Sequence, residues 1–144
     1  MCIMTNKKLY NILSWTWGLP LNLVGHIVAL VLMLIGYKPQ KWGGSYYFVV
    51  GENWGGFSLG SIIVVDEKYD EHALNHEFGH SIQNCYYGFF CPFIVSIPSC
   101  VRYWYQRIVV SLGLKQESEL PDYYSIWFEK QADEFGESHI KYWQ

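Results

Sequence analysis

A long hydrophobic run near the start of the chain is its first strong pattern. From Leu19 to Gly36 the chain has 18 residues without a charge, and only Asn22 and His26 are clearly polar. That length is the lower limit for crossing a bilayer core about 30 Å thick, and Trp, Tyr and Lys flank the run as they do at lipid–water interfaces. We favour a transmembrane helix, while a buried core helix and a cleaved signal peptide stay open.

Within this run, small or polar residues recur at helical spacing: Asn22, Gly25, His26, Ala29 and Met33. Such a stripe allows another element to approach closely, in a membrane or in a protein core. We expect His26 to be a hydrogen-bonded packing residue. Lysines at positions 7, 8, 38 and 41 lie on both sides of the run, so its orientation in a membrane stays open.

The middle of the chain has the pattern of β-strands. Ser45–Val50 and Phe57–Val65 are rich in β-branched and aromatic residues and flank a glycine-rich stretch, so we expect two strands joined by a turn. Gly60 indicates a bulge or a point where another group approaches the backbone closely. The acidic residues that follow, between positions 66 and 71, mark a turn and the start of a helix.

Two further segments are predicted downstream. Phe89–Val101 is apolar but interrupted by Pro92 and Pro98, which suits a re-entrant or interface-lying segment as well as a helix packed on the core. Tyr123–Tyr142 is predicted to be a helix. The fold class is therefore α+β: a short antiparallel hairpin or small sheet packs on the helix after position 70 and on a C-terminal glutamate helix, with an apolar N-terminal helix.

Composition narrows the class of protein. Of the 144 residues, 51% are hydrophobic, 19% aromatic and only 16% charged, which excludes a disordered chain. The net charge of −3 leaves no basic surplus, so we expect no nucleic-acid partner. Cys2, Cys85, Cys91 and Cys100 form no Cys-x-x-Cys pair, and we expect mainly buried free thiols. A Cys85–Cys91 disulfide stays open.

The chemistry of the chain centres on HEFGH, residues 76–80, which fits the pattern His-Glu-x-x-His. Two histidines four positions apart share one helix face, so His76 and His80 can bind one metal ion. Glu77 would lie beside that ion as the general base. The alternative is a helix with two histidines and no metal.

A catalytic zinc site usually has three protein ligands, so one more is needed. The residues after His80 read SIQNCYYGFF and supply no third histidine. Downstream, Glu129 and Asp133 form Glu-x-x-x-Asp on the predicted C-terminal helix. We predict Glu129 as the third ligand and Asp133 as the acceptor of the outer N–H of a ligand histidine. Small residues at Ala132 and Gly136 would let the two helices pack closely.

HEFGH followed by EKQAD resembles the gluzincin zinc metallopeptidases. The resemblance implies one Zn²⁺ held by His76, His80 and Glu129, with Glu77 as the base and Asp133 supporting a histidine. It implies hydrolysis of peptide bonds by a zinc-activated water. It also implies that peptide or protein substrate pairs with the strand before the motif, at Phe57, Ser58, Leu59, Gly60 and Ser61. The chain then divides into an N-terminal segment, 1–41, and a zincin-like catalytic domain, 42–144.

Other residues have weaker roles. Tyr123 or Tyr124 could stabilise a tetrahedral oxyanion, as phenol donors do. We expect His72 to be a helix-start or supporting residue rather than a ligand. Gln83 could bond a supporting group one turn after His80, and His139 is expected at the surface.

We expect a membrane-associated enzyme in a bacterial-type cell membrane, on a side that the sequence leaves open. Two alternatives stay open. The first is a non-catalytic, membrane-associated protein with a structural or partner-binding function, in which zinc holds the helices together. Its metal site would be closed by four protein ligands, for instance with His72 as the fourth. In the second, a membrane structural protein binds no metal.

Overall fold

The computed structural model describes residues 6–143, and its elements confirm the α+β class. Five α-helices and four strands make up most of this range. They are α1 (Lys7–Trp15), α2 (Leu19–Leu34), β1 (Gln40–Trp42), β2 (Ser45–Val49), β3 (Gly56–Leu59), β4 (Ile62–Val65), α3 (Glu71–Tyr87), α4 (Ile97–Ser111) and α5 (Trp127–Trp143). Short helical turns are η1 (Gly88–Phe90), η2 (Pro92–Ser96), η3 (Glu117–Glu119) and η4 (Tyr123–Ser125).

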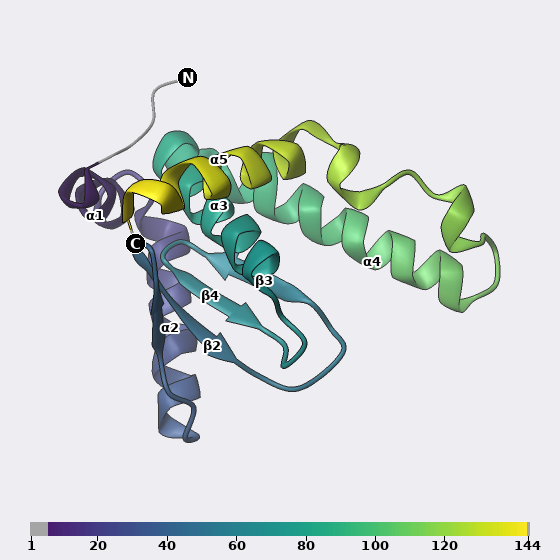
Figure 1. Cartoon of the computed structure of the whole chain (residues 1–144), viewed down its shortest axis with the longest axis horizontal. Coiled ribbons are helices and arrows are strands. Elements are labelled where there is room, and N and C mark those ends of the chain that lie inside the picture. Colours follow the sequence, from purple (N-terminus) through teal and green to yellow (C-terminus); the bar gives the residue numbers. More distant parts are fainter. Residues whose placement is uncertain (1–5, 144) are drawn as a thin grey trace.

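The four strands form one mixed sheet in the order β1-β2-β4-β3 (Figure 1). β2 and β4 are parallel, whereas β3 and β4 form an antiparallel hairpin. The predicted small sheet is confirmed, but the predicted hairpin between Ser45–Val50 and Phe57–Val65 is wrong, because the second run forms two strands. That run is broken at Gly60 and Ser61, where Gly60 has a φ of +62° and the chain reverses.

The turn between β3 and β4 is held by α2. The Asn22 side-chain oxygen accepts hydrogen bonds from the Ser61 backbone nitrogen at 2.9 Å and the Ser61 hydroxyl at 2.7 Å. A Cβ at Gly60 would lie 2.6 Å from the Asn22 Cα, so this position has no room for a side chain. The close approach predicted at Gly60 is confirmed, and its partner is the N-terminal half of α2.

The apolar N-terminal helix covers one face of the sheet. Ala29 and Leu32 of α2 pack with Phe48, Ile62 and Val64 from the strands. The small-residue stripe largely faces inward, because Asn22, Gly25 and Ala29 are buried while Met33 is exposed. His26 bonds the Asn22 carbonyl oxygen at 2.8 Å through Nδ1, as expected of a packing histidine.

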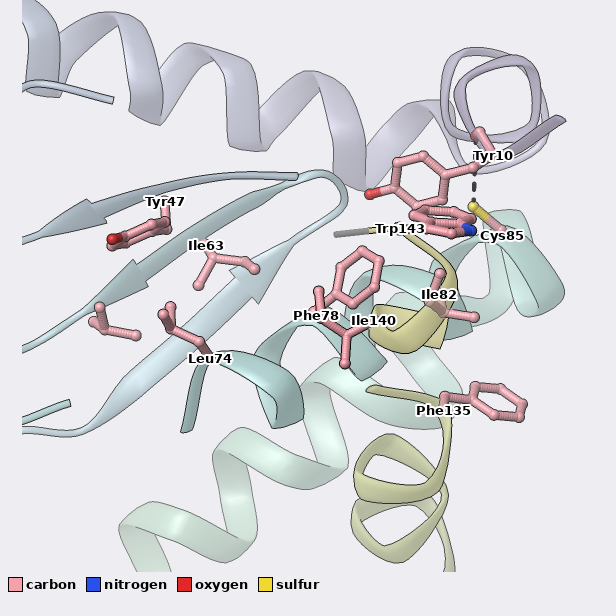
Figure 2. Packing of buried hydrophobic residues seen from close by; sticks show 11 residues of the cluster. Tyr10, Tyr47, Ile63, Leu74, Phe78, Ile82, Cys85, Phe135, Ile140 and Trp143 are labelled. Carbon is pink, nitrogen blue, oxygen red and sulfur yellow. Dashed lines mark hydrogen bonds between the residues drawn. The ribbon is translucent and has the colours of Figure 1, made fainter. Parts of the chain in front are cut away.

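The opposite face of the sheet packs on α1, α3 and α5, and this is the larger core (Figure 2). Its buried members include Tyr10, Ile63, Val65, Phe78, Ile82, Ile140 and Trp143. Since β4 points alternate residues into both cores, all four of its residues are buried. The Tyr10 hydroxyl bonds Ser45 and Ser81, which ties α1 to β2 and α3.

The helices on which the membrane prediction depends are short, and the pairs that they form are bent. Among residues 6–143, no single helix combines the length and apolarity needed to cross a bilayer. The pairs Lys7–Trp15 with Leu19–Leu34 and Glu71–Phe90 with Pro92–Ser111 reach that length together but bend by 92° and 115°.

The cysteine prediction is confirmed where the structure describes it. Cys85 and Cys91 are buried free thiols, and Cys100 is an exposed one. Burial raises the pKa of Cys85 to about 11 and that of Cys91 to about 12, which keeps both thiols protonated. Cys2 lies outside the described residues.

Candidate metal centre

Helix α3 carries the HEFGH motif and begins where the sequence predicts. Asp70 caps it by accepting the backbone N–H of Ala73 at 2.8 Å, and Glu71 lies in the first turn. One turn of helix separates His76 from His80, whose rings lie 4.7 Å apart. Both imidazoles face α5, the helix of the predicted third ligand.

The three predicted ligands converge. The Glu129 Oε2 atom lies 3.0 Å from His76 Nε2 and 3.2 Å from His80 Nε2. The two Nε2 atoms are 3.1 Å apart. Glu129 and His76 are buried and His80 nearly so, which makes this a small cluster largely shielded from solvent. Helix α5 begins at Trp127 rather than near Tyr123, and Glu129 therefore lies in its first turn.

Two supporting side chains set the tautomers of the histidines. His76 Nδ1 lies 2.8 Å from Asp133 Oδ1, as predicted, and a carboxylate can only accept. His80 Nδ1 lies 2.8 Å from Gln83 Oε1. The Gln83 nitrogen donates to the Phe128 carbonyl at 2.7 Å, so its oxygen must accept the His80 proton. Both Nε2 atoms therefore present lone pairs to Glu129.

This arrangement requires a positive charge at its centre. Two imidazole lone pairs and a carboxylate oxygen, all within about 3 Å, repel one another unless a proton or a metal ion lies among them. Burial alone would lower the pKa of His76, but its bonds to Asp133 and Glu129 raise that pKa to about 10. His76, His80 and Glu129 could thus hold a metal ion, whose identity the geometry leaves open.

The pKa of Glu129 also indicates that a positive charge belongs at the centre of the cluster. Burial favours the neutral form of Glu129, yet the rings of His76 and His80, which donate hydrogen bonds to it when protonated, hold its pKa far below the ordinary value. Its second oxygen, Oε1, is buried and meets no partner in hydrogen-bond geometry among the described residues. An ionised, incompletely bonded carboxylate at this depth fits a ligand to a cation.

Glu77 lines a cleft beside the ligand group. The cleft has a volume of about 270 Å³ and is lined by residues of the β2–β3 and β4–α3 loops, α3 and η4: Gly55, Gly56, Asp66, Lys68, Tyr69, Asp70, Ala73, His76, Glu77 and Tyr124. Glu77 Oε2 is buried without a hydrogen-bond partner among the described residues. Burial raises the pKa of Glu77 against the opposing charges of His80 and His76, as suits a general base.

Asp66 fixes the loop that forms the rim of this cleft. Its Oδ2 accepts the backbone N–H groups of Trp54 and Gly55, each at 2.9 Å. The bond from Gly55, which is the strongest contribution, holds the pKa of Asp66 below its ordinary value although burial opposes this. The carboxylate therefore keeps Gly56, the first residue of β3, against the cleft.

The predicted substrate strand is partly displaced. Phe57, Ser58 and Leu59 lie in β3, whose second edge is unpaired by any strand of the described chain. Gly60 and Ser61 lie in the turn and not in the strand, because the hairpin reverses there. A Cβ at Gly56 would lie 3.2 Å from Glu77 Oε1, so the open edge begins beside that carboxylate.

The two candidate tyrosines lie in different places. Tyr124 lines the cleft, and its ring centre is 5.0 Å from that of His76. The Tyr123 hydroxyl lies 2.7 Å from the Ser99 hydroxyl of α4, and it too is near the ligand group, because burial and then the negative charge of Glu129 raise its pKa. Burial raises the pKa of Tyr124, followed by the nearby negative charge of Asp133 and Glu77, so the phenol stays protonated and can donate.

Two other histidines lie outside the ligand group. The exposed His72 has its Nε2 atom 3.6 Å from Asp133 Oδ1, in keeping with a supporting position. The surface position predicted for His139 is wrong, since this residue is fully buried. Its Nδ1 bonds the Phe135 carbonyl at 2.7 Å, and its ring lies between Phe135 and Trp143 on the core side of α5.

The hydrogen-bond network that holds Gln83 beside His80 was largely missed by the sequence-based prediction. Gln83 also donates to Gln131 at 3.0 Å, and the Tyr87 hydroxyl donates to the same Gln131 oxygen at 2.8 Å. The available hint was the position of Gln83, which lies three residues after His80 on the same helix face. Its link to α5 depends on tertiary packing that a single sequence does not reveal.

Compared with protein-family models, curated proteins and solved structures, the chain matches none of them significantly.

Proposed function

We propose that this protein is a zinc-dependent metallopeptidase, with His76, His80 and Glu129 holding the metal ion. The observation that carries the proposal is the convergence of their Nε2, Nε2 and Oε2 atoms beside a buried carboxylate, Glu77, that opens into a cleft. Two imidazoles and one carboxylate are the donor set of many catalytic zinc sites.

The spacing of these atoms supports a tetrahedral metal ion. Ligands at about 2.0–2.1 Å from tetrahedral zinc lie about 3.3–3.4 Å from one another. The three distances among the ligand atoms, 3.0, 3.1 and 3.2 Å, are close to that value. The position of Glu77 beside two of the ligands favours hydrolysis over other chemistry of the same donor set.

A zinc ion in this site would supply Lewis-acid chemistry, lowering the pKa of water toward 7 and polarising a carbonyl group. Glu77 takes the proton of the attacking water while the water oxygen bonds to the scissile carbonyl carbon. The same carboxyl group then delivers that proton to the amide nitrogen as the C–N bond breaks. Its raised pKa suits both steps, because the carboxylate accepts a proton more readily than an ordinary glutamate does.

Other residues position the substrate. An extended peptide can add to the open edge of β3 through backbone hydrogen bonds, starting at Gly56 beside Glu77. The Tyr124 hydroxyl lines the same cleft and can donate to the developing oxyanion. The cleft next to the ligand group favours catalysis over a structural zinc staple, because a staple needs no opening.

Cleavage of a fluorogenic peptide library by the zinc-loaded protein tests this function. The substitution Glu77→Gln keeps the shape of the side chain and removes the base, so we expect bound zinc unchanged and turnover at least about 10³-fold lower. Glu71→Gln, an exposed residue on the same helix, is the matched control and should cleave as the wild type does. Equal cleavage by wild type and Glu77→Gln would refute the mechanism.

A further inference from the structure

Charge is unevenly divided along this chain. The segments 1–51 and 78–116 contain seven of the ten basic residues and none of the thirteen acidic residues. The basic residues are Lys7, Lys8, Lys38, Lys41, Arg102, Arg107 and Lys115. All acidic residues lie in the remaining segments, 52–77 and 117–144, which carry His76, Glu77 and Glu129. The exposed side chains of the two basic segments therefore differ in charge from those of the acidic segments.

The first basic segment exposes an aliphatic helix face. Opposite the side that packs on the sheet, α2 has exposed side chains that are all hydrophobic: Leu19, Leu23, Val24, Ile27, Leu30, Val31, Met33 and Leu34. Helix α2 contains no charged residue. An ordinary surface helix would place charged residues on this face.

The second basic segment has a comparable stripe. On α4, the exposed residues Ile97, Val101, Trp104, Tyr105 and Ile108 recur at spacings of three and four and therefore share one face. The other side of α4 packs toward the segment that joins it to α5, where Arg102 donates to the Asp122 and Tyr123 carbonyls. The stripe extends beyond α4 to exposed Leu112 and Leu114.

Aromatic residues connect the two segments. Trp17, between α1 and α2, has its ring centre 5.9 Å from that of Phe89 and 6.2 Å from that of Phe90. The Trp17 indole nitrogen donates to the Tyr86 carbonyl at 3.2 Å. Phe89, Phe90 and Phe93 are all exposed, so exposed apolar side chains continue along the chain from η1 through η2 to α4.

We propose that the exposed faces of α2 and α4, with Trp17, Phe89 and Phe90 between them, insert into one leaflet of an anionic lipid bilayer. The segregation of charge identifies the occupant, because exposed apolar residues in segments that contain basic and no acidic residues complement negatively charged headgroups. One side of α2 stays packed on β3 and β4, so lipid meets the opposite side alone. The helix then lies in the interface and does not cross the membrane.

Vesicle flotation of the full chain tests this proposal. The wild type should float with vesicles of phosphatidylcholine containing about one third phosphatidylglycerol, and less with phosphatidylcholine alone. The double variants Ile27→Gln with Val31→Gln, and Val101→Gln with Ile108→Gln, should each bind about tenfold more weakly or worse. Tyr142→Gln, an equally exposed position on the acidic helix α5, is the control and should float as the wild type does.

The basic residues have a separate effect. Replacing Lys38 and Lys41 by Gln should weaken binding to the anionic vesicles by about fivefold per lysine while leaving binding to phosphatidylcholine unchanged. Since the α2 and α4 faces lie outside the metal site, all variants should keep their zinc content and peptide cleavage. Flotation and catalysis therefore test two independent proposals.

Three results would overturn the membrane proposal. They are an absence of wild-type flotation on anionic vesicles, wild-type flotation by either double variant, and a stable dimer in lipid-free light scattering that the same substitutions dissociate. The last result would assign the apolar faces to contact between two copies of the chain.

Discussion

Gly79, inside the HEFGH motif, lies directly against the backbone of Ala132 on α5. A Cβ at Gly79 would be 1.8 Å from the Ala132 carbonyl oxygen, and one at Gly136 would be 1.8 Å from the Asn75 carbonyl oxygen. The absence of two side chains thus lets α3 and α5 pack closely. That separation brings Glu129 of one helix within 3.2 Å of the histidines on the other.

We predict that Gly79→Ala forces the two helices apart. The added methyl group meets backbone rather than a movable side chain, so the free energy of unfolding should fall by at least ~3 kcal/mol. Zinc affinity should fall with it, because Glu129 would lose its distance to His76 and His80. Gly36→Ala, where a Cβ meets nothing within 4 Å, should cost only about 1 kcal/mol of left-handed backbone strain. Chemical denaturation with and without zinc measures both effects, and equal losses would refute the packing argument.

Gln83 is predicted to orient His80 for metal binding. Gln83→Leu removes the acceptor of the His80 Nδ1 proton, so zinc affinity should fall by about 10–100-fold in competition with a chromogenic chelator. Gln83→Glu keeps an acceptor for His80 but loses the donor to the Phe128 carbonyl, so it should retain more affinity than Gln83→Leu and less than wild type. Gln131→Leu alters the same network without touching a histidine and serves as the control. Affinity equal to wild type in Gln83→Leu would remove Gln83 from the account.

Tyr124 and Tyr123 should differ in catalysis. Tyr124→Phe removes the hydroxyl from the cleft wall, and we expect kcat to fall by about 10²-fold with KM little changed. Tyr123→Phe removes a hydroxyl that bonds Ser99 on α4 and interacts with the ligand Glu129, so its effect should fall on zinc affinity, and kcat of the zinc-loaded protein should stay within about threefold of wild type. A larger loss in Tyr123→Phe than in Tyr124→Phe would reverse the assignment.

His139 should make the metal-free protein sensitive to mild acid. Burial lowers its pKa below the ordinary 6.5 against its bond to the Phe135 carbonyl, so the unfolded chain binds a proton more readily than the folded one. The contribution of neutral His139 to the free energy of unfolding is complete above pH 6.5. It is lost as pH falls through the lower pKa that His139 has in the folded state.

Urea unfolding in excess chelator, between pH 7.5 and 5, should show a steeper loss of stability for wild type than for His139→Gln. His76 acts in the opposite sense, because its pKa is raised to about 10 and its contribution is lost only at high pH. The difference between the two proteins isolates His139. Parallel pH curves for wild type and variant would contradict the burial argument.

The ligand group was predictable because it depends on local geometry. A spacing of four residues places His76 and His80 on one helix face in any α-helix, and Glu-x-x-x-Asp places Glu129 and Asp133 likewise. The start of α3 after Asp70 and the strand-rich middle followed from local patterns, whereas α5 begins at Trp127 and not near Tyr123 as predicted. Asp133 could be assigned to a histidine because a carboxylate one helical turn after a ligand glutamate can accept the outer N–H of a metal-bound histidine.

Features that depend on tertiary contacts were not predictable. The run Phe57–Val65 looks like one strand, and only the contact of Asn22 with Ser61 explains why it turns at Gly60. His139 lies among acidic residues in the sequence, yet its helix face meets Trp143 in the core. The parallel pairing of β2 with β4 joins segments through a connection that no local pattern specifies.

The central claim is that three side chains from two helices hold one zinc ion. The direct measurement is the zinc content per chain of wild type, Glu129→Gln and the control Glu134→Gln, an exposed carboxylate on the same helix. We predict one zinc ion in wild type and in the control, and an affinity at least about 10²-fold lower in Glu129→Gln. Equal zinc in all three proteins would place the third ligand elsewhere, and no zinc in any of them after reconstitution would contradict the metal centre itself.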